Sequence, residues 1–373
     1  MFSGDDHGHM GRALRLAERG LYTTEPNPRV GCVLVRDGAV VGEGWHERAG
    51  EPHAEVLALR AAGPRAAGAT AYVTLEPCAH HGRTPPCTEA LAAAGVTRVV
   101  VAMEDPNPLV RGAGLARLRS AGVTVECGLL EAQTRALNPG FVMRMTHGRP
   151  YVRAKLGMSL DARTAMASGE SRWITGPEAR RDVQRLRARS AAILTGIGTV
   201  LADDPSLTVR AADLGEPPPP GGWRQPLRVV LDPRLSTPPS ARMLTVPGRT
   251  LIATCCPDEE VPEAIIDGTA EVIRFPGHSD GIDLLPLLHY LAQEEEVNEM
   301  LLEAGATLSG SMLRAGLVDE LVLYVAPKIL GSDARGLFRL PGLERMEEAV
   351  GLEILEVRAI GNDWRVTARP SVP

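Results

Sequence analysis

The sequence predicts an α/β protein of two domains. The chain has 373 residues, and single domains usually contain about 100 to 200 residues. Short valine-rich runs alternate with helical patterns, which is typical of a sheet covered by helices on its faces. The glycine and proline of the segment 145–150 interrupt this alternation, and a second series follows. We therefore expect one domain over residues 1–147 and another over residues 148–373.

The first domain is predicted to begin its sheet with a β-hairpin. Two apolar runs, 30–35 and 40–45, flank Asp37-Gly38, a dipeptide typical of two-residue hairpin turns. The later strands are apolar throughout, as expected for the buried centre of a sheet. In chain order, we expect a helix at 53–62, a strand at 70–75, a helix at 87–94, a strand at 98–103, a helix at 114–121, a strand at 123–127 and a helix at 129–137.

The second domain is predicted to repeat the alternation. A helix is expected at 177–189, with proline in its first turn, where the missing N–H is tolerated. The proline-rich segment 216–222 can continue neither a helix nor a strand, so it is expected to be a surface loop. Strands are expected at 151–158, 191–195, 228–231, 250–254, 272–275, 299–302 and 320–325, and in the last 25 residues.

The composition favours small-molecule chemistry. The 46 acidic residues outnumber the 40 Lys and Arg residues, and aromatic residues make up 3% of the chain; nucleic-acid-binding proteins need basic and stacking surfaces. No apolar run approaches the roughly 18 residues of a membrane span, and no apolar secretion signal is expected at the amino terminus. Six dispersed cysteines do not resemble a disulfide framework. We expect a cytoplasmic protein that binds neither nucleic acid nor membrane.

A catalytic zinc site is predicted from His53, Cys78 and Cys87. One imidazole and two thiolates leave the fourth tetrahedral position open for water, as in catalytic and not structural sites. Zinc lowers the pKa of such a water to roughly 7. Zinc deaminases carry H-x-E followed by P-C-x-x-C, with the glutamate as acid and base. Here Glu55 completes H-x-E, and eight residues separate the two cysteines.

Two other functions remain open from these residues alone. A nucleic-acid-editing deaminase fused to an unrelated domain would share the zinc motif, although the acidic charge and the few aromatic residues oppose it. A zinc-stapled binding module without catalysis would need a fourth protein ligand. Either His80 or His81 could supply that ligand.

A dinucleotide-binding loop is less clearly marked. Gly196-Ile-Gly198 follows a predicted strand, but Leu201 occupies the third glycine position of G-x-G-x-x-G, so that fingerprint fails. A better candidate runs from Gly305 to Ser311, where a strand leads into a helix. Amides at a helix start bind phosphate. An ordinary strand-to-helix turn explains this segment equally well.

Several segments resemble the deaminase half of the bifunctional riboflavin-biosynthesis deaminase/reductases. They are Asn27-Pro-Arg-Val-Gly31, His53-Ala-Glu-Val, Thr74-Leu-Glu-Pro-Cys-Ala-His-His-Gly-Arg-Thr-Pro-Pro-Cys87 and Asp105-Pro-Asn-Pro108. The long cysteine spacing is usual in that family. The resemblance implies a three-layer, cytidine-deaminase-like domain. It also implies that Asn27, His46 and Asp105 hold the pyrimidine and ribose, and that His80 and Arg83 reach the substrate phosphate.

The second half resembles the reductase part of the same family, which is similar in fold to dihydrofolate reductase. The matching segments are Lys155-Leu-Gly-Met-Ser-Leu-Asp161, Gly169-Glu-Ser-Arg-Trp-Ile-Thr175, Ala202-Asp-Asp-Pro-Ser-Leu-Thr-Val-Arg210 and Glu303-Ala-Gly305. Ala162 departs from the family, in which glycine is usual after Asp161. The resemblance implies association into homo-oligomers through this half.

The same resemblance implies the cofactor and the reductase site. Lys155, one of only two lysines in the chain, is the candidate acid or electrostatic partner. Substrate contacts would be Ser171, Arg187, Leu207, Arg210 and Glu303. NADPH contacts would be Gly157, Trp173, Thr199, Asp203, Gly305, Ala306, Thr307, Leu308, Ser309, Gly310 and Ser311.

The implied activity is a two-step conversion in riboflavin synthesis. The first domain would hydrolyse the 2-amino group of 2,5-diamino-6-(5-phosphoribosylamino)pyrimidin-4-one and release ammonia. The second would then reduce the ribosyl group to ribityl with NADPH.

Overall fold

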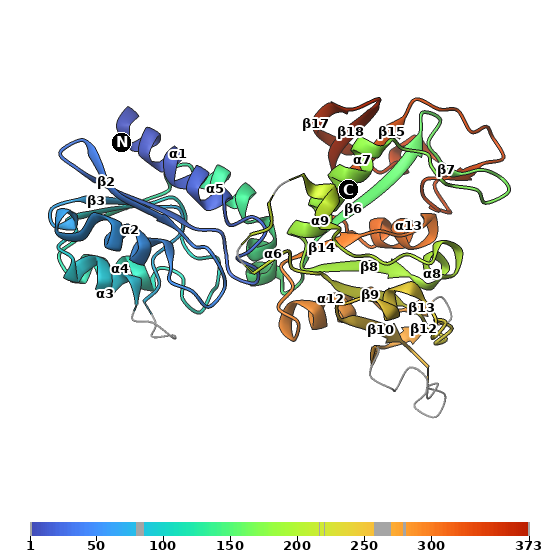
Figure 1. Cartoon of the computed structure of the whole chain (residues 1–373), viewed down its shortest axis with the longest axis horizontal. Helices are drawn as coiled ribbons and strands as arrows, with labels where there is room; N and C mark the ends of the chain where they lie inside the picture. Colours follow the sequence, from blue (N-terminus) through green and yellow to red (C-terminus); the bar gives the residue numbers. More distant parts are fainter. Residues whose placement is uncertain are drawn as a thin grey trace. The chain divides into compact units, whose positions relative to one another are not determined.

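The structure is a computed structural model, and it describes residues 2–79, 86–215, 217–219, 221–256, 270–278 and 281–371. The chain divides into two compact units, Met1–Arg149 and Pro150–Pro373. Each unit is built around its own main sheet (Figure 1). Each also has its own clusters of buried hydrophobic residues.

The first unit is built on a five-stranded sheet with strand order β2-β1-β3-β4-β5. The strand β1 pairs antiparallel with β2 and β3, whereas β3, β4 and β5 run parallel. Asp37 and Gly38 both have positive φ, 51° and 74°, as a two-residue hairpin turn requires. The predicted hairpin is therefore confirmed. The strands are β1 Gly31–Arg36, β2 Ala39–Trp45, β3 Thr70–Val73, β4 Arg98–Val101 and β5 Thr124–Cys127.

Helices cover both faces of this sheet, which gives three layers (Figure 1). Alternate residues of each strand point to opposite faces: Cys32 and Leu34 pack in one core, and Val33 and Val35 in the other. The first core is covered by the helices α2 Ala54–Ala62, α3 Cys87–Ala93 and α4 Ala113–Ser120. The second core is covered by the helix α1 Gly4–Glu18, and α5 Glu131–Leu137 lies beside α1. The helix α6 Pro139–His147 ends the unit.

The helix α1 was not predicted from the sequence. It begins with a capping box, because Ser3 Oγ accepts from the Asp6 amide at 3.0 Å and the Asp6 carboxylate accepts from the Ser3 amide at 2.8 Å. Asp6 is buried and also accepts from Tyr72 of β3, at 2.7 Å. The Ser-x-x-Asp spacing is the sequence feature that could have revealed this helix.

The second unit is built on a nine-stranded sheet with strand order β11-β10-β9-β8-β14-β6-β15-β18-β17. The strands from β11 to β15 in this order run parallel, and the last two form an antiparallel hairpin at one edge. Each predicted strand is confirmed to within two residues. They are β6 Tyr151–Ser159, β8 Ala192–Gly196, β9 Leu227–Leu231, β10 Thr250–Thr254, β11 Glu271–Arg274, β14 Glu299–Leu302, β15 Glu320–Ala326, β17 Leu352–Ile360 and β18 Asp363–Pro370.

Apolar helix faces cover both sides of this sheet as well. One core includes α12 and α13, and the other includes α7, α8 and α10. Because the strands are parallel, their carboxyl ends meet at one edge, where α/β proteins usually bind ligands. No helix in the described part of the chain is long and apolar enough to cross a membrane. The helices are α7 Pro177–Arg189, α8 Ile197–Asp203, α9 Ala211–Leu214, α10 Arg242–Thr245, α12 Leu284–Gln293 and α13 Ala306–Arg314.

Candidate active sites

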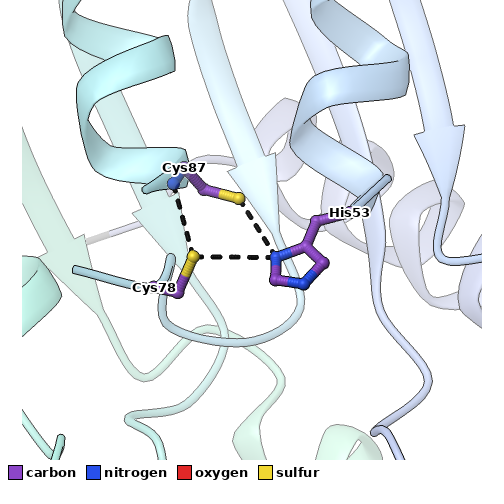
Figure 2. A group of neighbouring side chains, drawn as sticks. All are labelled: His53, Cys78 and Cys87. Carbon is purple, nitrogen blue, oxygen red and sulfur yellow. Dashed lines mark hydrogen bonds between the residues drawn. The ribbon is translucent and has the colours of Figure 1, made fainter. Parts of the chain in front are cut away.

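Three potential metal ligands converge in the first unit, as Figure 2 shows. His53 caps the start of α2, Cys87 is the first residue of α3, and Cys78 lies in the loop after β3. His53 Nδ1 lies 3.3 Å from Cys87 Sγ and 3.6 Å from Cys78 Sγ. All three ligand atoms lie within 4.8 Å of one another. Two sulfurs and one imidazole nitrogen at one point match the ligand preference of zinc.

The ionisation of the two cysteine thiols is also suited to binding a metal cation. The hydrogen bond from the Cys87 thiol, together with His53, lowers the pKa of Cys78 to about 4. The same hydrogen bond and burial raise the pKa of Cys87. Of the two thiols, Cys78 therefore loses its proton more readily. A divalent metal ion would hold both sulfurs as thiolates.

Glu55 lies in the first turn of α2 and is only 3% exposed. Burial raises the pKa of its carboxyl group, although the neighbouring His53 opposes this effect. A buried carboxyl group with a raised pKa is suited to exchanging protons near neutral pH.

Asn27 and His46 lie beside the cluster. Asn27 Nδ2 is 3.0 Å from His46 Nε2, and His46 Nδ1 is 3.2 Å from the carbonyl oxygen of Pro52. The amide donates to Nε2, so the His46 proton is on Nδ1 and is donated to Pro52. Burial lowers the pKa of His46, which favours this neutral form. The rings of His46 and His53 stand edge to face with centroids 5.5 Å apart.

Asp105 is held next to the loop that carries Cys78. Its amide donates to Glu76 Oε2 at 3.0 Å, and its own Oδ1 accepts from the Asn107 amide at 2.8 Å. Glu76 had no role in the sequence-based prediction, although it lies within the Thr-Leu-Glu-Pro-Cys stretch. The two predicted phosphate contacts, His80 and Arg83, lie outside the described residues.

A cavity of about 1390 Å³ lies in the second unit, at the carboxyl ends of its parallel strands. Both candidate phosphate loops, Gly196–Gly198 and Gly305–Leu308, line it. The remaining predicted residues that line it are Lys155, Gly157, Ser171, Trp173, Arg187, Thr199, Asp203, Leu207, Arg210, Glu303 and Ser311.

Two predicted cofactor contacts do not line this cavity. The Ser309 side chain is buried and donates to the carbonyl of Ala304 at 3.4 Å. Gly310 faces the interior, where a Cβ would lie 2.3 Å from the carbonyl oxygen of Arg339. In the helix α13, these two positions turn toward the protein, while Ser311 turns toward the cavity.

A charged triad forms one wall of the cavity. The Glu303 carboxylate contacts Lys155 Nζ at 3.2 Å and is bound by two nitrogens of Arg187, at 2.6 and 3.1 Å. Burial alone would raise the pKa of Glu303, but the charges of Arg187 and Lys155 outweigh it and lower the pKa to about 2. The carboxylate is therefore ionised at neutral pH, and it fixes the Lys155 ammonium group at the cavity wall.

Trp173 forms part of the cavity lining, and 63% of its surface is exposed. The Arg180 guanidinium lies over its ring at 4.5 Å, a cation–π geometry that restrains the indole. Lys328 Nζ donates to the Trp173 carbonyl at 2.6 Å. Both lysines of the chain therefore contact residues of this cavity. Arg180 also lines the cavity, and sequence reasoning had not singled it out.

Comparisons with known proteins cover both units. Residues 3–103 match the cytidine and deoxycytidylate deaminase zinc-binding region, and residues 150–366 match the RibD C-terminal domain. The chain is 55% identical to riboflavin biosynthesis protein RibD of Escherichia coli, over 96% of this chain and 97% of that protein. The Haemophilus influenzae RibD is 48% identical, over 99% and 98% of the two chains.

Solved structures agree with these sequence matches. Acinetobacter baumannii RibD superimposes with a TM-score of 0.91, at 47% identity and 99% coverage of both chains. A diaminohydroxyphosphoribosylaminopyrimidine deaminase/5-amino-6-(5-phosphoribosylamino)uracil reductase from Thermotoga maritima superimposes with a TM-score of 0.84, at 32% identity, covering 98% of this chain and 99% of that chain.

Proposed function

The chain belongs to the RibD family of bifunctional riboflavin-biosynthesis deaminase/reductases, and on this basis we propose how its two sites divide the two reactions. The family assignment confirms the predicted fold class, a cytidine-deaminase-like domain followed by a dihydrofolate-reductase-like domain. It also implies zinc and a nicotinamide cofactor. We assign deamination to residues 1–147 and reduction to residues 148–373. The two alternatives, an editing deaminase and a non-catalytic zinc module, lose their support because the relatives match nearly the whole chain.

In the deaminase domain, His53, Cys78 and Cys87 would hold the zinc ion, which supplies an activated water when bound. Glu55 would take the proton from that water and pass it to the departing 2-amino group, so that ammonia leaves. Asn27, His46 and Asp105 would hold the pyrimidine and ribose, and His80 and Arg83 the phosphate. The convergence of the three ligands beside Glu55 is the observation that carries this assignment.

In the reductase domain, we assign NADPH and the ribotide to the cavity of the second unit. Reduction of ribosyl to ribityl adds a hydride and a proton. A bound nicotinamide cofactor would supply the hydride, so the chain would have to deliver the proton or stabilise the charge that forms. Lys155 would serve this role, held in place by Glu303. Ser171, Arg187, Leu207, Arg210 and Glu303 would contact the substrate, and Gly157, Trp173, Thr199, Asp203, Gly305–Leu308 and Ser311 the cofactor.

The proposal is tested by incubating the purified protein with the diaminopyrimidine ribotide and analysing the products by mass. Without a nicotinamide cofactor, only the deaminated ribosyl compound should form. Addition of NADPH should give the ribityl product, and NADH should give it much more slowly. Failure of the zinc-loaded protein to deaminate this substrate would refute the deaminase assignment.

The zinc assignment predicts that Cys78→Ala abolishes stable zinc binding. Removal of one of three protein ligands leaves an incomplete site, and zinc sites depend on their full ligand set. Metal analysis of the purified variant measures the loss. Cys127→Ala is the matched control, because Cys127 on β5 is also a free cysteine but lies outside the cluster. Full zinc retention by both Cys78→Ala and Cys87→Ala would contradict the assignment.

We also propose that the protein forms a homo-oligomer through the reductase domain. The edge strand β17 and its neighbour β18 expose large apolar side chains, and such a patch is typical of an interface. Ile354→Asp should therefore shift the protein to a smaller assembly, as measured by light scattering. Leu109→Asp is the control, since Leu109 is 91% exposed in the other unit. The exposed residues are Leu352, Ile354, Leu355, Val357 and Trp364.

We further propose a cytoplasmic location, a small-molecule substrate, and no binding to nucleic acid or membranes. All six cysteines are free thiols in the structure, and reduced thiols are typical of the cytoplasm. The protein should keep its activity in reducing buffer. Binding assays with single-stranded nucleic acid and with anionic vesicles should detect no binding.

A further inference from the structure

Glu76 makes an unusual set of contacts in the deaminase domain. Its side chain is buried, and its two oxygens accept four backbone N–H groups. Oε2 accepts from Asp105 at 3.0 Å and from Gly112 at 2.9 Å. Oε1 accepts from Gly114 at 2.7 Å and from Leu115 at 3.3 Å. Each donor belongs to the segment that runs from Asp105 into the start of α4.

These contacts join two parts of the proposed deaminase site. Glu76 stands two residues before the predicted zinc ligand Cys78, and Asp105 is the predicted substrate contact. The two segments also touch directly, because a Cβ on Gly114 would lie only 2.1 Å from the carbonyl oxygen of Pro77. The packing at Gly114 and the hydrogen bonds of Glu76 therefore hold these two segments in one fixed arrangement.

A carboxylate suits this position for a chemical reason. An ionised carboxylate only accepts hydrogen bonds and has room for four of them, so it satisfies all four N–H groups. A glutamine of the same shape would direct its NH₂ group at backbone donors and leave part of the set unsatisfied. Buried donors without a partner are costly, so the segment would move to find one.

We propose that Glu76 is a positioning residue for deamination, acting through Asp105. It fixes the distance between the substrate-binding carboxylate of Asp105 and the zinc ligand Cys78. The inference rests on the proposed role of Asp105 in substrate binding. In this assignment Glu76 itself performs no proton transfer and no metal binding.

The test measures kcat and KM of deamination, zinc content and melting temperature for Glu76→Gln. We expect KM to rise roughly 10- to 100-fold, since a displaced Asp105 carboxylate would lose a hydrogen bond to the substrate, and a hydrogen bond to a charged group contributes a factor of about this size. Zinc should remain bound, because the ligand set is intact. Glu76→Asp keeps the charge and should recover part of the lost affinity.

Asp6→Asn is the matched control for a purely structural effect. Asp6 is likewise a buried carboxylate of the same unit that accepts several hydrogen bonds, but it packs in the other core, with α1. This variant should lose thermal stability without a change in the KM of deamination. If Glu76→Gln behaves in the same way, with lower stability and an unchanged KM, the positioning role is wrong.

A double variant tests the route through Asp105. Asp105→Ala should raise KM, and Glu76→Gln added to Asp105→Ala should raise it no further, because the residue it positions has been removed. Independent, additive effects on KM would overturn the inference. Should Glu76→Gln not fold, Glu76→Asp provides the same comparison. Failure of the wild-type protein to deaminate would instead refute the proposed function, so the two failures are distinguishable.

Discussion

Glu55→Gln is expected to lower the rate of deamination by roughly 10² to 10⁴, the usual scale for a lost general acid or base. Glutamine keeps the shape of the side chain and can still donate and accept hydrogen bonds, but it cannot carry the proton. The ligands His53, Cys78 and Cys87 are untouched, so zinc should remain bound. Single-turnover assays with the diaminopyrimidine ribotide, alongside metal analysis, measure both results.

The same variant tests whether the two reactions are separate. Every described residue that lines the reductase cavity belongs to the second unit. When the substrate is supplied already deaminated, the Glu55→Gln variant should therefore catalyse its reduction at the wild-type rate. A folded variant that has lost both activities would show that the chemistry is shared between the two sites.

Lys155→Ala is expected to lower the rate of reduction by roughly 10² to 10³, the scale observed when one preorganised charge or donor at a reaction centre is removed. Glu303 keeps its two hydrogen bonds from Arg187, so the buried carboxylate stays paired and the cavity should stay folded. Deamination should continue, and the deaminated ribosyl compound should accumulate. Product analysis over time in the presence of NADPH measures this accumulation.

Lys155→Arg separates the two possible roles of this lysine. Arginine keeps the positive charge and can pair with Glu303, but it does not give up its proton at accessible pH. A variant that retains most of the rate would identify Lys155 as an electrostatic partner, and a variant as slow as Lys155→Ala would identify it as the proton donor. If Lys155→Ala catalyses the reduction at the wild-type rate, both roles are excluded.

Local sequence patterns predicted most of the strands, because buried strands are continuous apolar runs that stand out from their surroundings. The grouping of His53, Cys78 and Cys87 was also predictable, since few residue types bind zinc. The helix α1 was missed because Gly4, Gly8 and Gly11 lower its helix propensity. Its stability comes from the capping box and from packing on the sheet.

Other features depend on contacts that sequence spacing does not reveal. The partners of Glu76 are backbone amides 29 to 39 residues further along the chain, and no motif marks a backbone donor. The family resemblance implies cofactor contacts along the whole segment from Gly305 to Ser311, whereas the turn of α13 directs Ser309 and Gly310 inward. Ala162 has a φ of 58°, so the alanine occupies the left-handed conformation for which glycine is better suited.

The positions of the two lysines have a practical consequence for chemical labelling. Lys155 lines the reductase cavity, and Lys328 binds the carbonyl of Trp173 in the same domain. Acylating dyes and crosslinkers that target lysine can therefore react only with the reductase domain. A bound nicotinamide nucleotide should shield Lys155 from such reagents, so its labelling rate would report occupancy of that cavity. Attachment to a surface through lysine would, for the same reason, place the reductase domain and not the deaminase domain at the support.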